Sequence, residues 1–415
     1  MKFKLGKPFF YDFLLALCII VPYVNVFELT MMVWGLTMLL TLKKKYSFSV
    51  IQFIIPLVLV FLISFFSGIF EDYILYNKIR DIAYLLKPII GILLGYQLCR
   101  AHQINPMKTL INIGLIIAVY HLIQVVYGIT FFRIRHIHDL RYFAGYFSDY
   151  EAYALVILMF HKRFGITYTQ KQYLLYLAIL GSSVLFYMSR TNFLQVGILA
   201  FGILGYYKLS TKSIKIVSIF VLGTILVYSA LFQMNLSRNG SGLEALLFKI
   251  KNAPIEAFKT KVNKHNWQDF NDNFRSYENI ITVRQVEAGG TLNVLFGKGV
   301  GSTVDYGLKM LTNDGTYIRH APILHNAYAT IFLKSGLLGL LISFYFLTLF
   351  WKKSNHSDEV ITSLDKLFVA SGVFLILANW VLLGIYLKLD NKAIIFGYLL
   401  AYRHYLISNQ KVNEK

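Results

Sequence analysis

The residue types that can carry out chemistry gather between residues 284 and 342, where a basic, glycine-containing stretch runs into an apolar helix. His325 lies at the start of that helix, shortly after Pro322, which a first helical turn tolerates because the missing N–H would be unpaired there anyway. A helix start also presents unpaired N–H groups and a positive dipole end, which favours a phosphate beside the imidazole. The pattern predicts a base or a phosphate ligand, and the alternative is a histidine that only hydrogen-bonds the loop.

Arginines at the ends of apolar segments are the candidates for binding a phosphate. Arg190 closes one apolar segment, and Arg284 and Arg319 lie on either side of a glycine cluster. A guanidinium binds phosphate through two N–H groups at once, which a lysine ammonium does less well. The alternatives are a lipid-headgroup anchor at Arg190 and a solvated loop arginine at Arg284. The same phosphate chemistry is available to Arg133, Arg135 and Arg141.

A polar stripe enters one apolar segment at Arg80, Tyr84 and Lys87, which follow one another at i, i+4 and i+7. Positions with this spacing share one face of a helix. An ammonium deep in a bilayer must find water, a carboxylate or a phosphate. Arg80 and Lys87 are therefore predicted to bind substrate, and the alternative is pairing with Asp81 or Glu71.

Glycines at positions 297, 299 and 301 follow a short apolar run that is typical of a strand. A nucleotide-binding loop needs a strand before it, a helix directly after it and a lysine-serine pair, and this combination is not found around the three glycines. We therefore predict a tight turn beside the next helix. That helix, over residues 322–350, is too long to cross perpendicularly a hydrocarbon core of about 30 Å. Lys334-Ser335-Gly336 predicts a break in it, with Lys334 near the outer interface as a snorkelling lysine or a phosphate ligand.

Metal and disulfide chemistry are not expected. Cys18 and Cys99 both lie in or beside apolar segments. No cluster of His, Asp and Glu has metal-ligand spacing, with His136, His138 and Asp139 as an isolated exception. We expect no metal and no cofactor.

The elements that position these groups belong in a membrane. Of the 415 residues, 56% are apolar and 15% charged, which exposes too much apolar surface for water. The formal charge of +20 is scattered between apolar segments, so anionic lipid is a better partner than nucleic acid. The basic, then apolar start lacks a small-residue cleavage site, which predicts an uncleaved first helix.

We predict an all-α integral membrane protein, a single polytopic domain over residues 1–415 with about twelve transmembrane helices. A span needs about 20 apolar residues. Such stretches lie near residues 9–27, 28–42, 49–70, 79–98, 109–128, 144–161, 172–188, 191–207, 214–232, 322–350, 364–386 and 393–407.

The short lysine-rich turns of this arrangement fall on one side together with both termini, and the positive-inside rule makes that side the cytoplasm. Residues 233–321, between spans nine and ten, then form one large external loop, whose length exempts it from the charge rule. Helical apolar spacing at residues 243–250, 255–262 and 277–286 predicts short amphipathic helices over the external membrane face.

The order of these features resembles the O-antigen polymerase and O-antigen ligase family. Its members carry an arginine in a large external loop, a glycine-repeat turn, and His-Asn-x-Tyr before a glycine-rich helix. The counterparts here are Arg284, the turn from Gly297 to Gly301, and His325-Asn326-Ala327-Tyr328, with a weaker match at Ser189 to Asn192 and at Gly145 to Ala154.

The resemblance implies a GT-C-like fold and a metal-independent glycosyltransferase of the bacterial plasma membrane. Its donor would be a polyprenyl-diphosphate-linked oligosaccharide, and its acceptor a hydroxyl of another lipid-linked glycan in a polymerase or of a lipid core in a ligase. A flippase and a chain-length regulator would be further partners. Catalytic roles would fall to His325, Arg190 and Arg284, and substrate binding to Arg80, Lys87, Arg319, Asn326 and Tyr328.

Two other classes remain open. A polysaccharide flippase or transporter would also have many spans and a cationic cavity, but it should show paired halves with discontinuous helices in corresponding positions, which the sequence lacks. A structural or signalling membrane protein would not need basic residues at span ends to face one cavity. The polymerase is favoured because the external loop is large, aromatic and basic enough to hold a second lipid-linked glycan.

Overall fold

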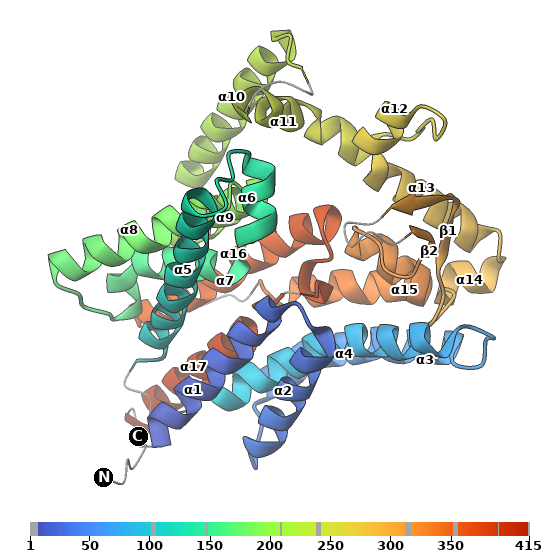
Figure 1. Cartoon of the computed structure of the whole chain (residues 1–415). Helices are drawn as coiled ribbons and strands as arrows, with labels where there is room; N and C mark the ends of the chain where they lie inside the picture. Colours follow the sequence, from blue (N-terminus) through green and yellow to red (C-terminus); the bar gives the residue numbers. More distant parts are fainter. Residues whose placement is uncertain are drawn as a thin grey trace.

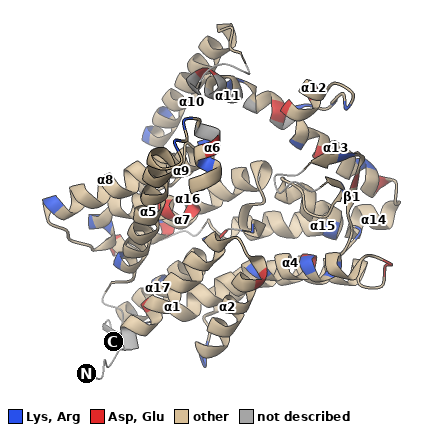
Figure 2. Ribbon diagram, viewed as in Figure 1, with Lys and Arg blue, Asp and Glu red and all other residues tan. Residues whose placement is uncertain are grey.

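The computed structural model describes residues 7–100, 105–146, 148–207, 210–237, 242–311, 317–351, 356–388 and 390–413. The described chain is a bundle of helices with one two-stranded antiparallel sheet at the side of the later helices (Figure 1). Charged residues are sparse along the long helices and more frequent at helix ends and from α11 to α14 (Figure 2).

Each of the twelve apolar stretches corresponds to at least one helix, which confirms an all-α membrane architecture. The first five stretches correspond to α1 (Lys7–Ile20), α2 (Phe27–Leu40), α3 (Phe48–Gly68), α4 (Leu75–Leu98) and α5 (Pro106–Thr130). The other seven correspond to α7 (Asp149–Met159), α8 (Gln170–Phe186), α9 (Arg190–Leu204), α10 (Thr211–Gln233), α15 (Ala327–Thr348), α16 (Glu359–Val381) and α17 (Lys392–Asn413).

Among the described residues, six helices are long and apolar enough to cross a membrane, namely α3, α4, α5, α10, α15 and α16. The others are shorter or more polar. Helix α7 has 11 residues and is therefore about 16 Å long, well short of a hydrocarbon core of about 30 Å. The stretch 144–161 is not one helix, because α6 (Ile137–Ala144) ends at Gly145, whose φ of +127° leaves the helical region before α7 begins.

The core lies between α4 and α17, between α3 and α15, and between α16 and α9. Small residues allow the closest of these approaches. A Cβ at Gly95 would come 1.9 Å from the carbonyl oxygen of Ile394, and a Cβ at Gly397 would come 1.9 Å from that of Ile92. Helices α4 and α17 therefore pack backbone against backbone, as small residues allow in membrane bundles.

The segment from 233 to 321 is ordered by short elements that return to the bundle. They are α11 (Gly242–Phe258), α12 (Trp267–Asp272), α13 (Phe274–Glu287), α14 (Thr291–Phe296), β1 (Val304–Leu311) and β2 (Tyr317–Ala321). The expected helix over 277–286 is α13, whereas 255–262 is helical only to Phe258. The strand prediction for the run that ends at Phe296 is wrong, because six residues bounded by Gly290 and Gly297 form the helix α14 instead. The hairpin of β1 and β2 was not expected.

The glycine turn lies wedged between α3 and the middle of α15. Gly297, Gly299 and Gly301 have φ values of +76°, +77° and +88°, which favour glycine. The amide of Lys298 donates to the carbonyl of Leu333 at 2.7 Å, and that of Val300 to Ser64 at 2.9 Å. The predicted break in α15 is confirmed, since Gly336 has φ +63° and ψ −159°.

Candidate catalytic dyad and arginine cavity

His325 forms a dyad with Glu278 of α13. The imidazole Nδ1 lies 2.9 Å from Oε2 of Glu278, and the backbone N–H of His325 donates to the same oxygen at 3.1 Å. Because a carboxylate only accepts, it holds the hydrogen on Nδ1 and leaves Nε2 with a lone pair. The imidazole side chain is 55% exposed, whereas that of Glu278 is 1% exposed. A carboxylate of the chain therefore lies beside the imidazole, on the side of Nδ1.

Buried aromatic residues fix the other side of this carboxylate. The hydroxyl of Tyr306, on β1, donates to Oε1 of Glu278 at 2.5 Å, and the hydroxyl of Tyr277 donates to the carbonyl of Tyr306. Burial, and then the charge of Glu278, raises the pKa of Tyr306 well above its ordinary value, so its proton stays in place. The ring of Phe274 meets the imidazole edge to face at 5.7 Å. Tyr306 of the β-hairpin thus orients the carboxylate of Glu278, and this carboxylate in turn orients the imidazole of His325.

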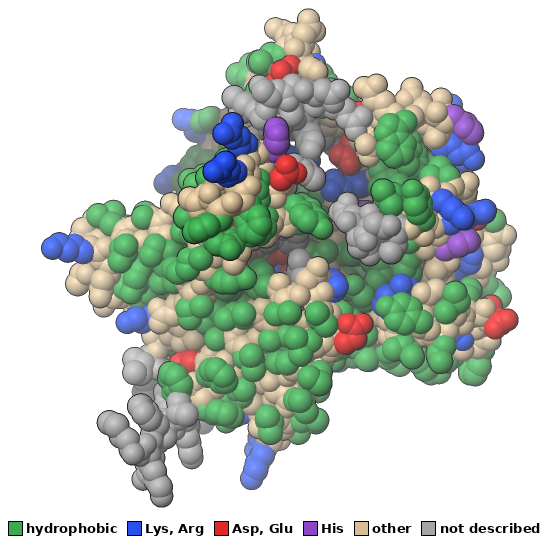
Figure 3. Space-filling view, in the orientation of Figure 1, with side chains coloured by type: hydrophobic (Ala, Val, Ile, Leu, Met, Phe, Trp, Pro, Cys, Tyr) green, Lys and Arg blue, Asp and Glu red, His purple; other side chains and the backbone are tan. Residues whose placement is uncertain are grey.

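A cavity of about 480 Å³ opens between α9, α10, α11, α13 and α16. The molecule is hollowed between α11 and α13, with basic and acidic side chains inside (Figure 3). One part of the lining is polar and carries Arg190, Glu256, Arg275 and Asn279. The other part is apolar and aromatic, with Phe193, Leu194, Tyr228, Phe374, Leu377 and Trp380. A cavity of this composition fits an anionic head joined to an apolar chain.

Among the described residues that line this cavity, arginines outnumber carboxylates. Arg275 Nη1 lies 3.4 Å from Oε1 of Glu256, and Arg190 lies within electrostatic range of both. Arg141 on α6 also lies within electrostatic range of Arg190: burial, and then the like charge of Arg190, lower the pKa of Arg141. Oδ1 of Asn279 is buried with no hydrogen-bond partner in the described structure. The surplus of positive charge favours an anionic ligand.

Helix α13 joins the cavity to the dyad. Arg275 and Asn279 are spaced at i and i+4 and line the cavity, whereas Phe274 and Glu278 have the same spacing and contact His325. The two pairs of residues lie on neighbouring faces of α13, about 100° apart around the helix axis. A ligand held by the arginines therefore has the imidazole on the adjacent face of the same helix.

Two of the predicted arginines lie elsewhere. Arg284 is exposed, about 13 Å along α13 from Arg275 and on the opposite face, because nine residues turn an α-helix by about 180°. Arg319 lies on β2 and binds Asp305 on β1. Its Nε donates to Oδ1 of Asp305 and its Nη2 donates to Oδ2, both at 2.8 Å. The Arg319 hydrogen bond lowers the pKa of Asp305 to about 2. Arg190 and Arg284 are not brought together, and Arg319 closes the hairpin.

The residues after His325 shape the start of α15. The side chain of Asn326 accepts from the amides of Tyr328 and Ala329 at 2.9 and 3.2 Å, so it is the N-cap of this helix. The hydroxyl of Tyr328 donates to the carbonyl of Ile376 on α16 at 3.2 Å. Both side chains are buried. Their contacts position His325 and do not face the cavity.

The stripe on α4 is divided between two buried networks. Arg80 donates to Asn77 and lies 3.8 Å from Asp81, which in turn pairs with Lys334 at 2.5 Å. Lys334 is 2% exposed, so neither the snorkelling position nor the phosphate-binding role predicted for it is correct. Asp81 also accepts from the amide of Gly301, so this pair ties α4, α15 and the glycine turn together.

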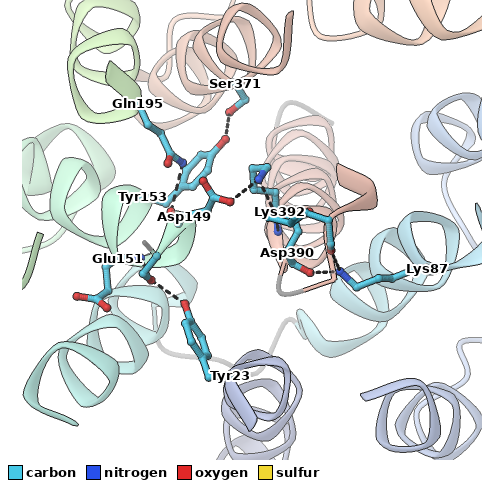
Figure 4. Close-up of polar contacts among 11 residues, drawn as sticks. Tyr23, Lys87, Asp149, Glu151, Tyr153, Gln195, Ser371, Asp390 and Lys392 are labelled. Atoms are coloured by element: carbon cyan, nitrogen blue, oxygen red, sulfur yellow. Dashed lines mark hydrogen bonds and ion pairs between the residues drawn. The ribbon is translucent and has the colours of Figure 1, made fainter. Parts of the chain in front are cut away.

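Lys87 belongs to a second network in the middle of the bundle (Figure 4). Its ammonium donates to the carbonyls of Leu387 and Asp390 before α17, and neither alternative partner, Asp81 or Glu71, contacts it. Lys392 lies between the carboxylates of Asp149 and Asp390, at 2.5 and 2.6 Å. Two lysines thus balance two aspartates, as a buried ionic cluster requires. Lys87 is 1% exposed and holds α4 against α17.

Two residues of the site, Glu278 and Arg275, were not singled out from the sequence. Both lie on the helix predicted over 277–286 or just before it, and their spacing with Phe274 and Asn279 is visible in the sequence. The contact between Glu278 and His325 could not be predicted, because the two residues lie 47 positions apart along the chain.

Among the described residues, no group of three or more His, Cys, Asp and Glu side chains is placed to hold a metal ion. Cys18 and Cys99 are free and buried. The chain matches no family model and no curated protein.

Proposed function

We propose that the chain is a glycosyltransferase at the outer face of a bacterial plasma membrane, which polymerises lipid-linked oligosaccharide repeat units. Its donor is a glycan on a polyprenyl diphosphate, and its acceptor is a hydroxyl of a second lipid-linked glycan. The observation that carries this proposal is the sharing of α13 between the His325–Glu278 dyad and a cavity that is both cationic and apolar. A lipid diphosphate fits the cavity, and a sugar hydroxyl fits the exposed imidazole.

In this reaction, the bond between the anomeric carbon of the donor sugar and the diphosphate oxygen breaks. Its electron pair stays on the diphosphate, where Arg190 and Arg275 stabilise the developing charge. The acceptor oxygen forms the new bond to that carbon, and its proton passes to Nε2 of His325. Glu278 stabilises the imidazolium, as the carboxylate of a catalytic triad does. The leaving polyprenyl diphosphate departs into the lipid.

The proposal includes a topology of twelve crossings, with both termini in the cytoplasm and residues 233–321 outside. Support comes from the lysine-rich short turns, which this arrangement places inside. A periplasm-active reporter fused after Asn252 should be active, and the same reporter fused after Thr169 should not. A reporter after Asn252 that works only in the cytoplasm would put the cavity on the wrong face for this donor.

Arg190 and Arg275 are expected to matter more than Arg284. Arg190→Ala and Arg275→Ala should each lower the rate of product formation about a hundredfold, because each removes a charged donor from the leaving group. Arg190→Lys should recover only part, since a point charge loses the bidentate grip. Arg284→Ala is the matched control, and its rate should stay within about threefold of the parent because the side chain is exposed on another face.

The assay is transfer from a purified lipid-linked repeat unit, with products separated on a gel and protein amounts matched. Full activity of Arg190→Ala would remove Arg190 from the diphosphate site. An Arg284→Ala variant as inactive as Arg190→Ala would show that the diphosphate lies outside the cavity described above.

A further inference from the structure

Within the arginine cavity, one group has the wrong charge for an anion site. The charged side chains among its described lining residues are Arg190, Arg275 and Glu256. The carboxylate of Glu256 lies 3.4 Å from Nη1 of Arg275 and within electrostatic range of Arg190. An entering diphosphate and this carboxylate would compete for the same guanidinium groups, because both bind through oxygens to the N–H fork.

The geometry of the ion pair between Arg275 and Glu256 allows its two side chains to separate. Its two side chains are 31% and 22% exposed, and the 3.4 Å separation is long for a charge-assisted hydrogen bond, which is usually about 2.7–2.9 Å. By contrast, the backbone of the same residue is held firmly, since the hydroxyl of Ser276 donates to the carbonyl oxygen of Glu256. The carboxylate can leave Arg275 without any movement of α11 as a whole.

We propose that Glu256 is a resident counter-ion of the diphosphate site. In the empty site, the carboxylate of Glu256 neutralises Arg275. When the donor binds, its diphosphate displaces this carboxylate. After transfer, the carboxylate returns to Arg275 and competes with the departing polyprenyl diphosphate. The carboxylate therefore weakens the binding of substrate and product alike and speeds the release of product. This inference rests on the proposed function, because it assumes that the cavity holds the diphosphate.

The test measures binding of farnesyl diphosphate, a short soluble polyprenyl diphosphate, to the purified full-length protein in detergent. Glu256→Gln removes the charge and keeps the size of the side chain and the backbone contact with Ser276. It should tighten the dissociation constant about fivefold, which corresponds to a loss of about 1 kcal/mol of competing ion-pair energy. Glu287→Gln, which makes the same charge change at the far end of α13, should leave it unchanged.

The effects of Arg275→Ala and Glu256→Gln should not be additive, because the carboxylate acts mainly through Arg275; in the Arg275→Ala background it can act only on Arg190, which also lies within its electrostatic range. With the full lipid-linked substrate, Glu256→Gln should lower KM and kcat together, since slower product release limits turnover. A merely structural role would weaken binding and lower kcat with KM unchanged or raised.

The outcomes separate this inference from the proposed function. Farnesyl diphosphate binding that depends on Arg190 but is unchanged or weaker in Glu256→Gln would overturn the counter-ion role and leave the diphosphate site standing. If the parent protein does not bind farnesyl diphosphate, both the counter-ion role and the proposed diphosphate site are wrong. The same holds if Arg190→Ala binds it as tightly as the parent does.

Discussion

Replacing His325 by glutamine is expected to lower the rate of chain growth about a thousandfold, with donor affinity unchanged. Glutamine keeps a hydrogen-bonding group of similar reach but cannot take the acceptor proton, and general base catalysis contributes typically 10²–10⁴-fold. Arg190 on α9 and Arg275 on the neighbouring face of α13 are expected to keep their hold on the diphosphate. Single-turnover transfer and farnesyl diphosphate binding, measured on the same preparation, check the two halves of this expectation.

Glu278→Gln is the companion variant, because Glu278 acts only through the imidazole. It keeps an oxygen that can accept from Tyr306 or from His325 but removes the charge that stabilises the imidazolium, so a loss of about a hundredfold in kcat with little change in KM is expected. Thr362→Ala is the control variant, because Thr362 lies near the start of α16, about 18 Å along that helix from the cavity residue Phe374, and its activity should equal that of the parent. A His325→Gln enzyme with parental activity would exclude the base role.

The products of the same assay decide between polymerase and ligase. A ladder of longer lipid-linked glycans from one purified substrate supports the polymerase. Transfer only after a separate lipid-core acceptor is added would identify a ligase, and the dyad and cavity would serve both reactions equally. His325→Gln should abolish whichever product the parent makes.

The sequence allowed the helices to be predicted, because their signal is local. Apolar runs of about 20 residues predict helices wherever the chain supplies them, and Gly336 marks a break through its own backbone preference. The hairpin of β1 and β2 was not predicted, although apolar residues alternate with Asp305, Gly307 and Lys309 along β1. Gly307, with φ +69°, interrupts the run, and the register shifts between Asp305 and Met310, so the pairing of the two strands is irregular.

The candidate site could be predicted only where one residue carries the signal. His325 was singled out by its place at a helix start, and Arg190 by its place at the end of an apolar segment, in both cases together with the resemblance to the polymerase and ligase family. The partner of a buried charge, by contrast, is a property of the packed structure: Lys87 bonds to carbonyls about 300 residues away, and Lys334 pairs with Asp81 across 253 residues. A basic residue in an apolar segment therefore indicates that a partner exists, and only packing shows whether it is substrate or protein.

The buried pair of Lys334 and Asp81 supplies the largest expected effect on stability. Each side chain is 2% exposed, and Asp81 holds the amide of Gly301 while Lys334 also donates to the carbonyl of Ser302 at 2.5 Å. Lys334→Met leaves the carboxylate without its buried counter-charge. Removing one partner of such a pair typically costs about 3–5 kcal/mol, so the unfolding free energy in detergent should fall by about that amount.

The double variant Asp81→Asn with Lys334→Met should recover most of this loss, because both fully buried charges are removed together and asparagine can still accept from Gly301. Arg80 loses its ion pair with Asp81, but it is 21% exposed and keeps its hydrogen bond to Asn77. Lys309→Met, on the exposed face of β1, makes the same side-chain change and should alter stability by no more than about 0.5 kcal/mol. Denaturant unfolding of the four proteins in one detergent, followed by circular dichroism, gives the comparison. Because the pair joins α4 to the break in α15 and to the glycine turn, a double variant no more stable than Lys334→Met would show that the ammonium acts there through Ser302 and packing, and that the ion pair with Asp81 contributes little.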